Sequence, residues 1–77
     1  MRYEKINPIQ QFNFQINRIL TYGEIAADVN TVRKKTAKIR TFDEWQNVWS
    51  DMGKLAEQKS EFLRAAYCFR MAEFFLK

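Results

Sequence analysis

The pattern that most constrains this fold lies between Thr41 and Leu76. Over the first half of that stretch, apolar residues recur every three or four positions, the spacing that places side chains on one face of an α-helix. Over the second half, apolar residues occupy nearly every face, and four polar residues (57–60) separate the two halves. The stretch therefore predicts two helices folded back on each other, the second with more apolar surface than a chain of 77 residues easily covers. The stripe of the first helix consists of Phe42, Trp45, Val48, Trp49, Met52, Leu55 and Ala56.

Local signals define the ends and the packing of this hairpin. Thr41 and Glu44 have the spacing of a capping box, which predicts the start of the first helix. Ser60 is a candidate N-cap for the second helix. Gly53 lies in the middle of the first helix, where glycine costs about 1 kcal/mol relative to alanine. We therefore expect a neighbouring helix to approach closely at that position.

Helix signals also occur in the N-terminal half. Asn7 and Pro8 predict a helix start, because asparagine is a good N-cap and proline suits the first helical position. Gly23 is the predicted terminator of this helix. Phe14 falls outside the apolar stripe and suggests a second contact surface. The stripe itself consists of Ile9, Phe12, Ile16, Ile19 and Leu20.

The connection between the first two helices has two possible forms. In one, Thr21 and Glu24 form a capping box that starts the second helix at once. In the other, Asp28 or Asn30 is the N-cap, and the residues before it form a turn. Either form leads to a helix with one apolar face that ends near Arg40.

These signals predict a single all-α domain over 1–77, an antiparallel helical hairpin or compact bundle of about four helices. The last helix has no stop signal, so we expect the polypeptide to continue beyond Lys77. The predicted helices span 8–21, 29–40, 42–58 and 61–76. The residues expected to pack the hairpin are Trp45, Trp49, Gly53, Ala65 and Ala72. The residues expected to form an interface are Phe69, Phe74, Phe75 and Leu76.

The composition excludes several kinds of catalytic site. The chain has no histidine, so it contains no Ser-His-Asp or Cys-His arrangement and no histidine metal site. Its one cysteine, Cys68, lies in the most apolar segment, where an inert buried thiol is expected. A single cysteine forms neither an internal disulfide nor a multi-cysteine zinc site. We therefore expect no catalytic residue, no metal site and no cofactor in this chain.

The N-terminal residues and the hydropathy bear on localisation. The first eleven residues, MRYEKINPIQQ, lack the apolar segment of a secretory signal. No window approaches the ~18 consecutive apolar residues of a membrane span. Together with the single cysteine, these observations favour a cytoplasmic protein with no membrane partner.

Positive charge is concentrated in the N-terminal half of a chain whose net charge is +4. The segment from Arg33 to Arg40 is rich in Lys and Arg, which contact phosphates in nucleic-acid binding proteins. No recognition-helix pattern follows this segment, and the aromatic residues lie at core spacing instead of among the lysines. We therefore interpret the segment as a solvated helix face and expect no nucleic-acid partner.

Part of the hairpin matches the tetratricopeptide pattern W-x2-L-G-x2-Y followed by A-x3-F. The matching positions are Trp49, Met52, Gly53, Ala56, Ala65 and Phe69. Shifting the pattern back by its ~34-residue period finds no second copy, and about three copies are needed to bury a continuous core. A tetratricopeptide-like helical protein-interaction module is therefore the alternative interpretation.

A wider set of residues supports a resemblance that covers about 12–76. The set consists of Phe14, Gln15, Arg18, Leu20, Tyr22, Gly23, Ala27, Asp28, Ala37, Ile39, Trp45, Trp49, Ala56, Ala65, Ala66, Phe69, Arg70, Ala72, Glu73, Phe74 and Phe75. With these residues the chain resembles the N-terminal helical segment of α/β-hydrolases similar to 2,6-dihydroxypseudooxynicotine hydrolase and fermentation-respiration switch protein. One departure is the turn at 23–26, which has a single glycine where many members of the family are glycine-rich.

The resemblance implies a helical cap or arm that precedes a catalytic α/β domain, helps to close its site and often joins subunits. It also implies a serine nucleophile in a G-x-S-x-G motif, with Asp and His partners, in that other domain. This chain contains neither the motif nor a histidine, so none of those roles passes to a residue here. We therefore expect a non-catalytic N-terminal cap and association domain of a serine-type α/β-hydrolase. Its expected partners are its own catalytic domain, a second copy of the chain, or both.

Overall fold

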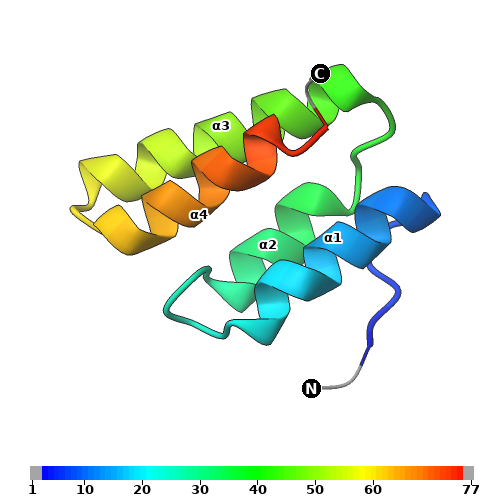
Figure 1. Ribbon diagram of the computed structural model, residues 1–77, viewed down its shortest axis with the longest axis horizontal. Helices are drawn as coiled ribbons and strands as arrows, with labels where there is room; N and C mark the ends of the chain where they lie inside the picture. The colour runs from blue at the N-terminus through cyan, green and yellow to red at the C-terminus, as the bar shows by residue number, and fades with distance from the viewer. Residues whose placement is uncertain (1–2, 76–77) are drawn as a thin grey trace.

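The computed structural model describes residues 3–75 as four α-helices in two antiparallel pairs, and it contains no strand in this range. The α3–α4 hairpin lies over the α1–α2 pair, as Figure 1 shows. The predicted all-α helical bundle is therefore confirmed. The helices are α1 (Gln10–Thr21), α2 (Val29–Thr36), α3 (Phe42–Gln58) and α4 (Phe62–Glu73).

The hairpin begins with the predicted capping box. The Glu44 backbone N–H donates to Thr41 Oγ1 at 3.0 Å, and the Thr41 N–H donates to Glu44 Oε1 at 3.1 Å. α4 approaches α3 closely at Gly53, because a Cβ added there would lie 2.7 Å from the Phe69 ring. A side chain at this position would have to displace that ring, which explains a glycine in the middle of a helix.

Ser60 ends α3 and is not the N-cap of α4, so that prediction is wrong. Its φ of 60° is in the left-handed region, which is uncommon for a residue with a side chain. The Ser60 N–H donates to Glu57 O, and the Glu61 N–H donates to Ala56 O, both at 2.9 Å. These two bonds form a Schellman motif, and Glu61 precedes α4 without a side-chain cap.

The predicted start of the first helix at Pro8 is also wrong, because Asn7 has a different structural role. Ile9 is the N-cap of α1 and has no side-chain cap bond. Asn7 Oδ1 accepts from the Ile9 N–H, while Asn7 Nδ2 donates to the carbonyls of Thr36 and Ile39, each at 2.8 Å. Asn7 therefore joins the N-terminal segment to the end of α2.

These hydrogen bonds explain why α2 ends at Thr36 and not near Arg40, as the sequence had suggested. Asn7 takes the Thr36 and Ile39 carbonyls, and Arg40 Nη1 donates to the carbonyls of Ala37 and Ile39. Side chains therefore satisfy acceptors that further helical N–H groups would otherwise occupy. The other helix bounds differ by less: α4 begins one residue later than predicted and ends at Glu73.

The connection between α1 and α2 follows the second of the two predicted forms. Gly23 ends α1 with a φ of 79°, and its N–H donates to Leu20 O at 3.1 Å. Asp28 is the N-cap of α2, because its side chain accepts from the N–H groups of Asn30 and Thr31. The residues between Gly23 and Asp28 form a turn, with no capping box.

The two helical pairs meet in an aromatic core. Phe12 of α1 stacks on Trp45 of α3, with ring centroids 5.1 Å apart, and Phe75 contacts both rings. Trp45 is fully buried and donates through Nε1 to the Met71 carbonyl of α4. Trp49 is equally buried beside it. This cluster fixes the end of α4 against α1 and thereby positions the surface described next.

Candidate association surface

Aromatic side chains remain exposed on the side where α1 and α4 come together. Tyr3, Phe14, Tyr22 and Phe74 each keep about half or more of their surface open to solvent. Tyr22 packs against Tyr67 across the two helices, with ring centroids 5.4 Å apart. Phe74 likewise contacts Phe75, at 5.1 Å. We refer to this set as the aromatic face, and it consists of Tyr3, Phe14, Tyr22, Tyr67, Phe74 and Phe75.

A groove of about 530 Å³ runs between α1 and α4 through this face. Its walls include Arg18 from α1 and Arg70 from α4. The Arg18 guanidinium lies 5.9 Å from the centre of the Phe74 ring, within cation–π range, and its Nη1 donates to Gln15 Oε1 at 3.1 Å. No ion pair within residues 3–75 includes either arginine. The groove therefore combines aromatic rings with two arginines and one carboxylate, Glu73, and none of these three charges is in an ion pair within residues 3–75.

Gln15 connects this groove to a second hollow. It borders both, and the second hollow, of about 310 Å³, is also lined by Tyr3, Phe14 and Phe75. The two hollows are thus neighbours along α1, separated by the Gln15 side chain. An extended surface of this kind is typical of contact with another folded surface, whereas a catalytic cleft is more enclosed.

The four residues predicted to form an interface occupy different environments. Phe74 is 47 % exposed and belongs to the aromatic face. Phe75 is half-buried in the aromatic core, and Phe69 is half-buried with its ring against Gly53. Leu76 lies outside the described residues. The interface itself stays a prediction. Because Phe69 packs on Gly53 whereas Phe74 is exposed, we expect the centre of that interface to lie nearer to α1 than Phe69 does.

The residues predicted to pack the hairpin all lie in the interior, and they are Trp45, Trp49, Gly53, Ala65 and Ala72. Sequence reasoning gave no role to Tyr3 or Tyr22, whose exposure depends on how α4 lies against α1. Phe14 was the available signal, because it fell outside the apolar stripe, and it is 53 % exposed.

A smaller apolar spot lies at the far tip of the hairpin. Phe62 and Leu63, at the start of α4, are 69 % and 50 % exposed. Neither lines the groove or the second hollow, so this spot is separate from the aromatic face. It therefore offers an apolar surface against which the aromatic face can be compared.

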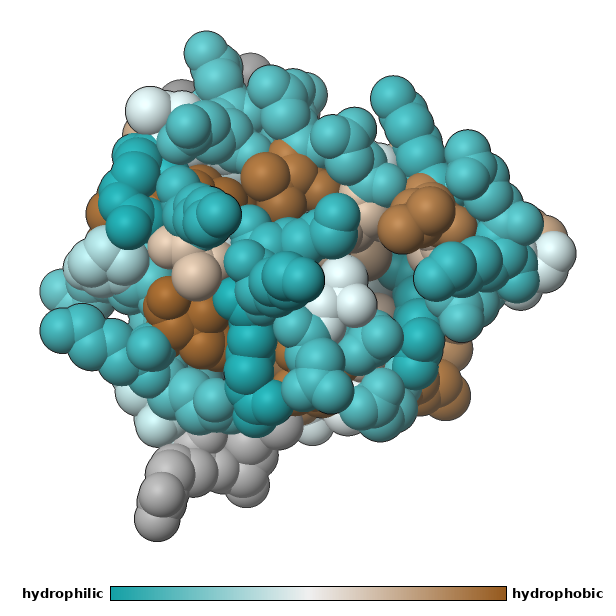
Figure 2. Space-filling view, turned by 180° about the vertical axis from the view of Figure 1, so that it is seen from behind, coloured by the Kyte–Doolittle hydropathy of each residue, from teal (hydrophilic) through white to brown (hydrophobic). Residues whose placement is uncertain are grey.

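The reverse side of the molecule has a different character. Figure 2, seen from behind the view of Figure 1, shows a largely hydrophilic surface with apolar side chains in separate spots. The lysines of the basic segment, Lys34, Lys35 and Lys38, are exposed and border a hollow that also contains Asp51. The segment is an exposed basic face, and no aromatic residue lines this hollow.

Chemically reactive groups are few in the described part of the chain. Burial raises the pKa of the Cys68 thiol to about 11, so at neutral pH it is protonated and a poor nucleophile. Within residues 3–75, no cluster of acidic and cysteine side chains has the geometry to hold a metal ion. No helix in the same range has the length and hydropathy needed to cross a bilayer.

No protein-family model, curated protein or solved structure matches the chain. The aromatic face, which combines exposed rings with adjoining charge, is therefore the feature on which a functional interpretation rests.

Proposed function

We propose that this chain is a non-catalytic helical association domain that uses the aromatic face to pack against another folded protein surface. The observation that carries the proposal is the set of exposed aromatic side chains that line two adjoining hollows at α1 and α4. Aromatic and arginine side chains are enriched at protein interfaces because they bury a large area and also offer polar contacts. Full burial of one large apolar side chain contributes about 1.5–3 kcal/mol, so the burial of several such rings favours association against its entropic cost.

The setting we propose is an α/β-hydrolase, with this chain as its N-terminal cap and association domain. The residues that carry the resemblance include Leu20, Ala27, Trp45 and Trp49, which are all buried. A homologous protein with the same residues at these positions would have the same buried core and the same packing of α4 against α1. The serine nucleophile and its partners would then lie in a catalytic domain beyond this chain.

The intact mass of the native protein tests this setting. We expect a product well above the 9.3 kDa of this chain, with a G-x-S-x-G peptide in its digest. We also expect the native protein, but not the 77-residue chain, to be labelled by a fluorophosphonate probe that reacts with activated serines. A native product of 9.3 kDa that resists labelling would remove the hydrolase setting and leave the association domain as a separate question.

A tetratricopeptide-like interaction module is a second candidate because of one contact. The Phe69 ring packs directly on Gly53, which matches the way the A-x3-F and G positions of that pattern bring two helices together. In this alternative, further helical hairpins would stack on α3–α4 and bind an extended peptide. The same native digest distinguishes the two settings, since repeated copies of about 34 residues would replace the G-x-S-x-G peptide.

A further inference from the structure

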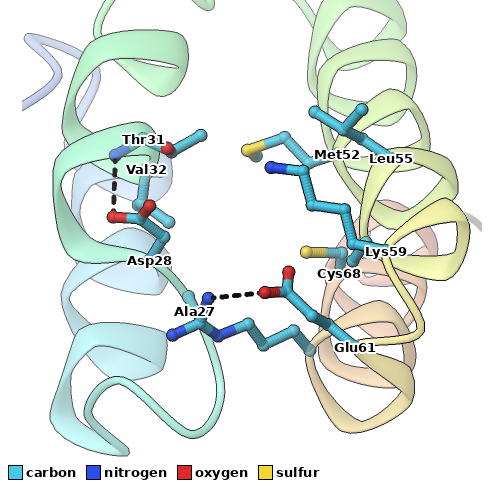
Figure 3. A pocket seen from close by; sticks show the side chains of 11 residues that line it. Ala27, Asp28, Thr31, Val32, Met52, Leu55, Lys59, Glu61 and Cys68 are labelled. Atoms are coloured by element: carbon cyan, nitrogen blue, oxygen red, sulfur yellow. Dashed lines mark hydrogen bonds and ion pairs between the residues drawn. The ribbon is translucent and has the colours of Figure 1, made fainter.

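The end of the domain opposite the aromatic core contains a small cleft between the two helical pairs. It has a volume of about 110 Å³, and Figure 3 shows it between α2 and the α3–α4 hairpin. This space is closer to the size of a single small metabolite than to that of a nucleotide or a peptide. The floor of the cleft is apolar and consists of Ala27, Val32, Met52 and Cys68.

The Arg64 guanidinium lines the cleft and is already paired with acidic side chains. Arg64 donates from Nε to the Glu24 carbonyl at 2.7 Å and from Nη2 to its carboxylate at 3.2 Å. The same guanidinium reaches Glu61 Oε2 at 3.4 Å. Because Glu24 precedes α2 and Arg64 belongs to α4, this bridge joins the two walls at one end of the cleft.

Two further charges on the rim face each other without pairing. Asp28 lies on the α2 wall, and Figure 3 shows Lys59 extending from the opposite wall into the cleft toward α2. No ion pair within residues 3–75 includes Asp28 or Lys59. The cap bonds of Asp28 are both accepted by Oδ1, which leaves Oδ2 to accept from a ligand. The cleft therefore presents one anion and one cation above an apolar floor.

We propose that this cleft binds a free aliphatic α-amino acid. In such a molecule the ammonium and the carboxylate are attached to the same carbon, so together they bridge two opposite charges that face each other. The ammonium donates to Asp28 and the carboxylate accepts from Lys59 Nζ, both as charge-assisted hydrogen bonds. The aliphatic side chain then lies on the floor beside Val32 and Met52, where the protonated Cys68 thiol adds no charge.

The ligand series that tests this proposal changes one charge at a time. L-Leucine carries both charges, 4-methylpentanoate lacks the ammonium, and 3-methylbutylamine lacks the carboxylate. In methyl NMR titrations of the full 77-residue chain, L-leucine should shift the methyl groups of Met52 and Ala27 saturably. Each single-charge analogue should bind about tenfold more weakly. No saturable shift with L-leucine, or equal binding of an analogue, would overturn the proposal.

Matched variants connect the binding to the two rim charges. Lys59→Met and Asp28→Asn should each weaken L-leucine about tenfold, and asparagine keeps the N-cap of α2, so the second variant stays folded. Lys54→Met is the control, because Lys54 is an exposed residue of α3 that does not line the cleft. Equal affinity in Lys59→Met and Lys54→Met would show that Lys59 does not receive the carboxylate, and the proposal would fail. Neither result bears on the separate proposal that this chain is the N-terminal domain of an α/β-hydrolase.

Discussion

The α3–α4 hairpin and the α1–α2 pair are held together by different kinds of interaction. In the hairpin, apolar side chains from each helix interlock, with Phe69 against Gly53 and the Trp45 indole under the end of α4. The α1–α2 pair also has buried apolar side chains, such as Ile16, Leu20 and Val32, but buried amides add specific connections there. Asn13 accepts from the N–H groups of Ile6 and Asn7, and Asn7 in turn reaches the end of α2.

This difference predicts which mutations destabilise each half most. Apolar packing loses stability roughly in proportion to the volume removed, so the hairpin tolerates small changes and fails with large ones. A buried amide network depends on each partner, because removing one leaves others without a hydrogen bond in the interior. Chemically modest changes in the α1–α2 pair should therefore cost more than their size suggests.

The largest effect is expected from Trp45→Ala, which removes one of the two largest fully buried side chains in the core. We expect a loss of about 3–5 kcal/mol, comparable to the whole stability of a domain of this size. The chain should then be largely unfolded by circular dichroism at 25 °C. Trp45→Phe should cost much less, because it keeps most of the packing and loses the bond to Met71 O. A folded Trp45→Ala variant would contradict the view that this cluster joins the two pairs.

The next effect tests the amide network through Asn13→Ala. This change leaves the backbone N–H groups of Ile6 and Asn7 without their acceptor, and we expect a loss of about 2–3 kcal/mol in urea unfolding. Gln11→Ala, at an exposed position of the same helix, is the matched control and should change stability by less than about 0.5 kcal/mol. If both variants lose the same small amount, then apolar packing holds both halves and the comparison is wrong.

A smaller effect tests the close contact in the hairpin. Gly53→Ala improves helix propensity by about 1 kcal/mol. When Phe69 is present, the added methyl group has to displace its ring, and this cost offsets the gain. In a Phe69→Ala background the ring is absent, so Gly53→Ala should stabilise the protein by about 1 kcal/mol. A double-mutant cycle measures the difference. A coupling energy near zero would mean that Gly53 is not required for the approach of α4.

The smallest effect concerns the link between the N-terminal segment and α2. Hydrogen bonds from the Arg33 guanidinium, at 2.8 and 2.7 Å, lower the pKa of Glu4 below its ordinary value of 4.5. A lowered carboxyl pKa adds stability that is present above pH 4.5 and is lost as the pH falls through the folded-state value. Arg33 is exposed and Glu4 is partly exposed, so solvent screens the pair and the contribution is small and salt-sensitive.

Glu4→Gln tests this link. The melting temperature of the variant should be slightly below that of the parent chain at neutral pH, and the difference should vanish in strong acid and shrink in high salt. An NMR titration of the Glu4 carboxyl should give a midpoint below 4.5. A midpoint at or above that value would show that the pair does not persist in solution.

The same contrast explains what the sequence could predict. The helical period of α3, its capping box at Thr41 and the small residue at Gly53 are local signals, and all three were found in the structure. The ends of α1 and α2 depend on Asn7, whose partners are 29 and 32 residues away, and no local pattern reveals such bonds. Ser60 was misread because serine is a common N-cap and only rarely adopts the left-handed conformation it has here.

The candidate association surface was also predictable only in part. The chain shows an excess of apolar surface in its last helix, but which rings remain exposed depends on how α4 packs on α1. Phe69 and Phe75 find partners inside the domain, whereas Phe14 and Phe74 do not become buried. Tertiary packing, which periodicity does not specify, therefore moved the expected interface toward α1.

Sedimentation velocity of the 77-residue chain tests the role of the aromatic face most directly. An isolated domain that exposes an association surface should self-associate at micromolar concentration, and Phe14→Glu/Phe74→Glu should make it monomeric by burying charge in the contact. Phe62→Glu/Leu63→Glu, which alters the apolar spot at the hairpin tip, should leave the association intact. A folded parent chain that is strictly monomeric, or association lost only in the hairpin-tip variant, would contradict the proposed role of the aromatic face.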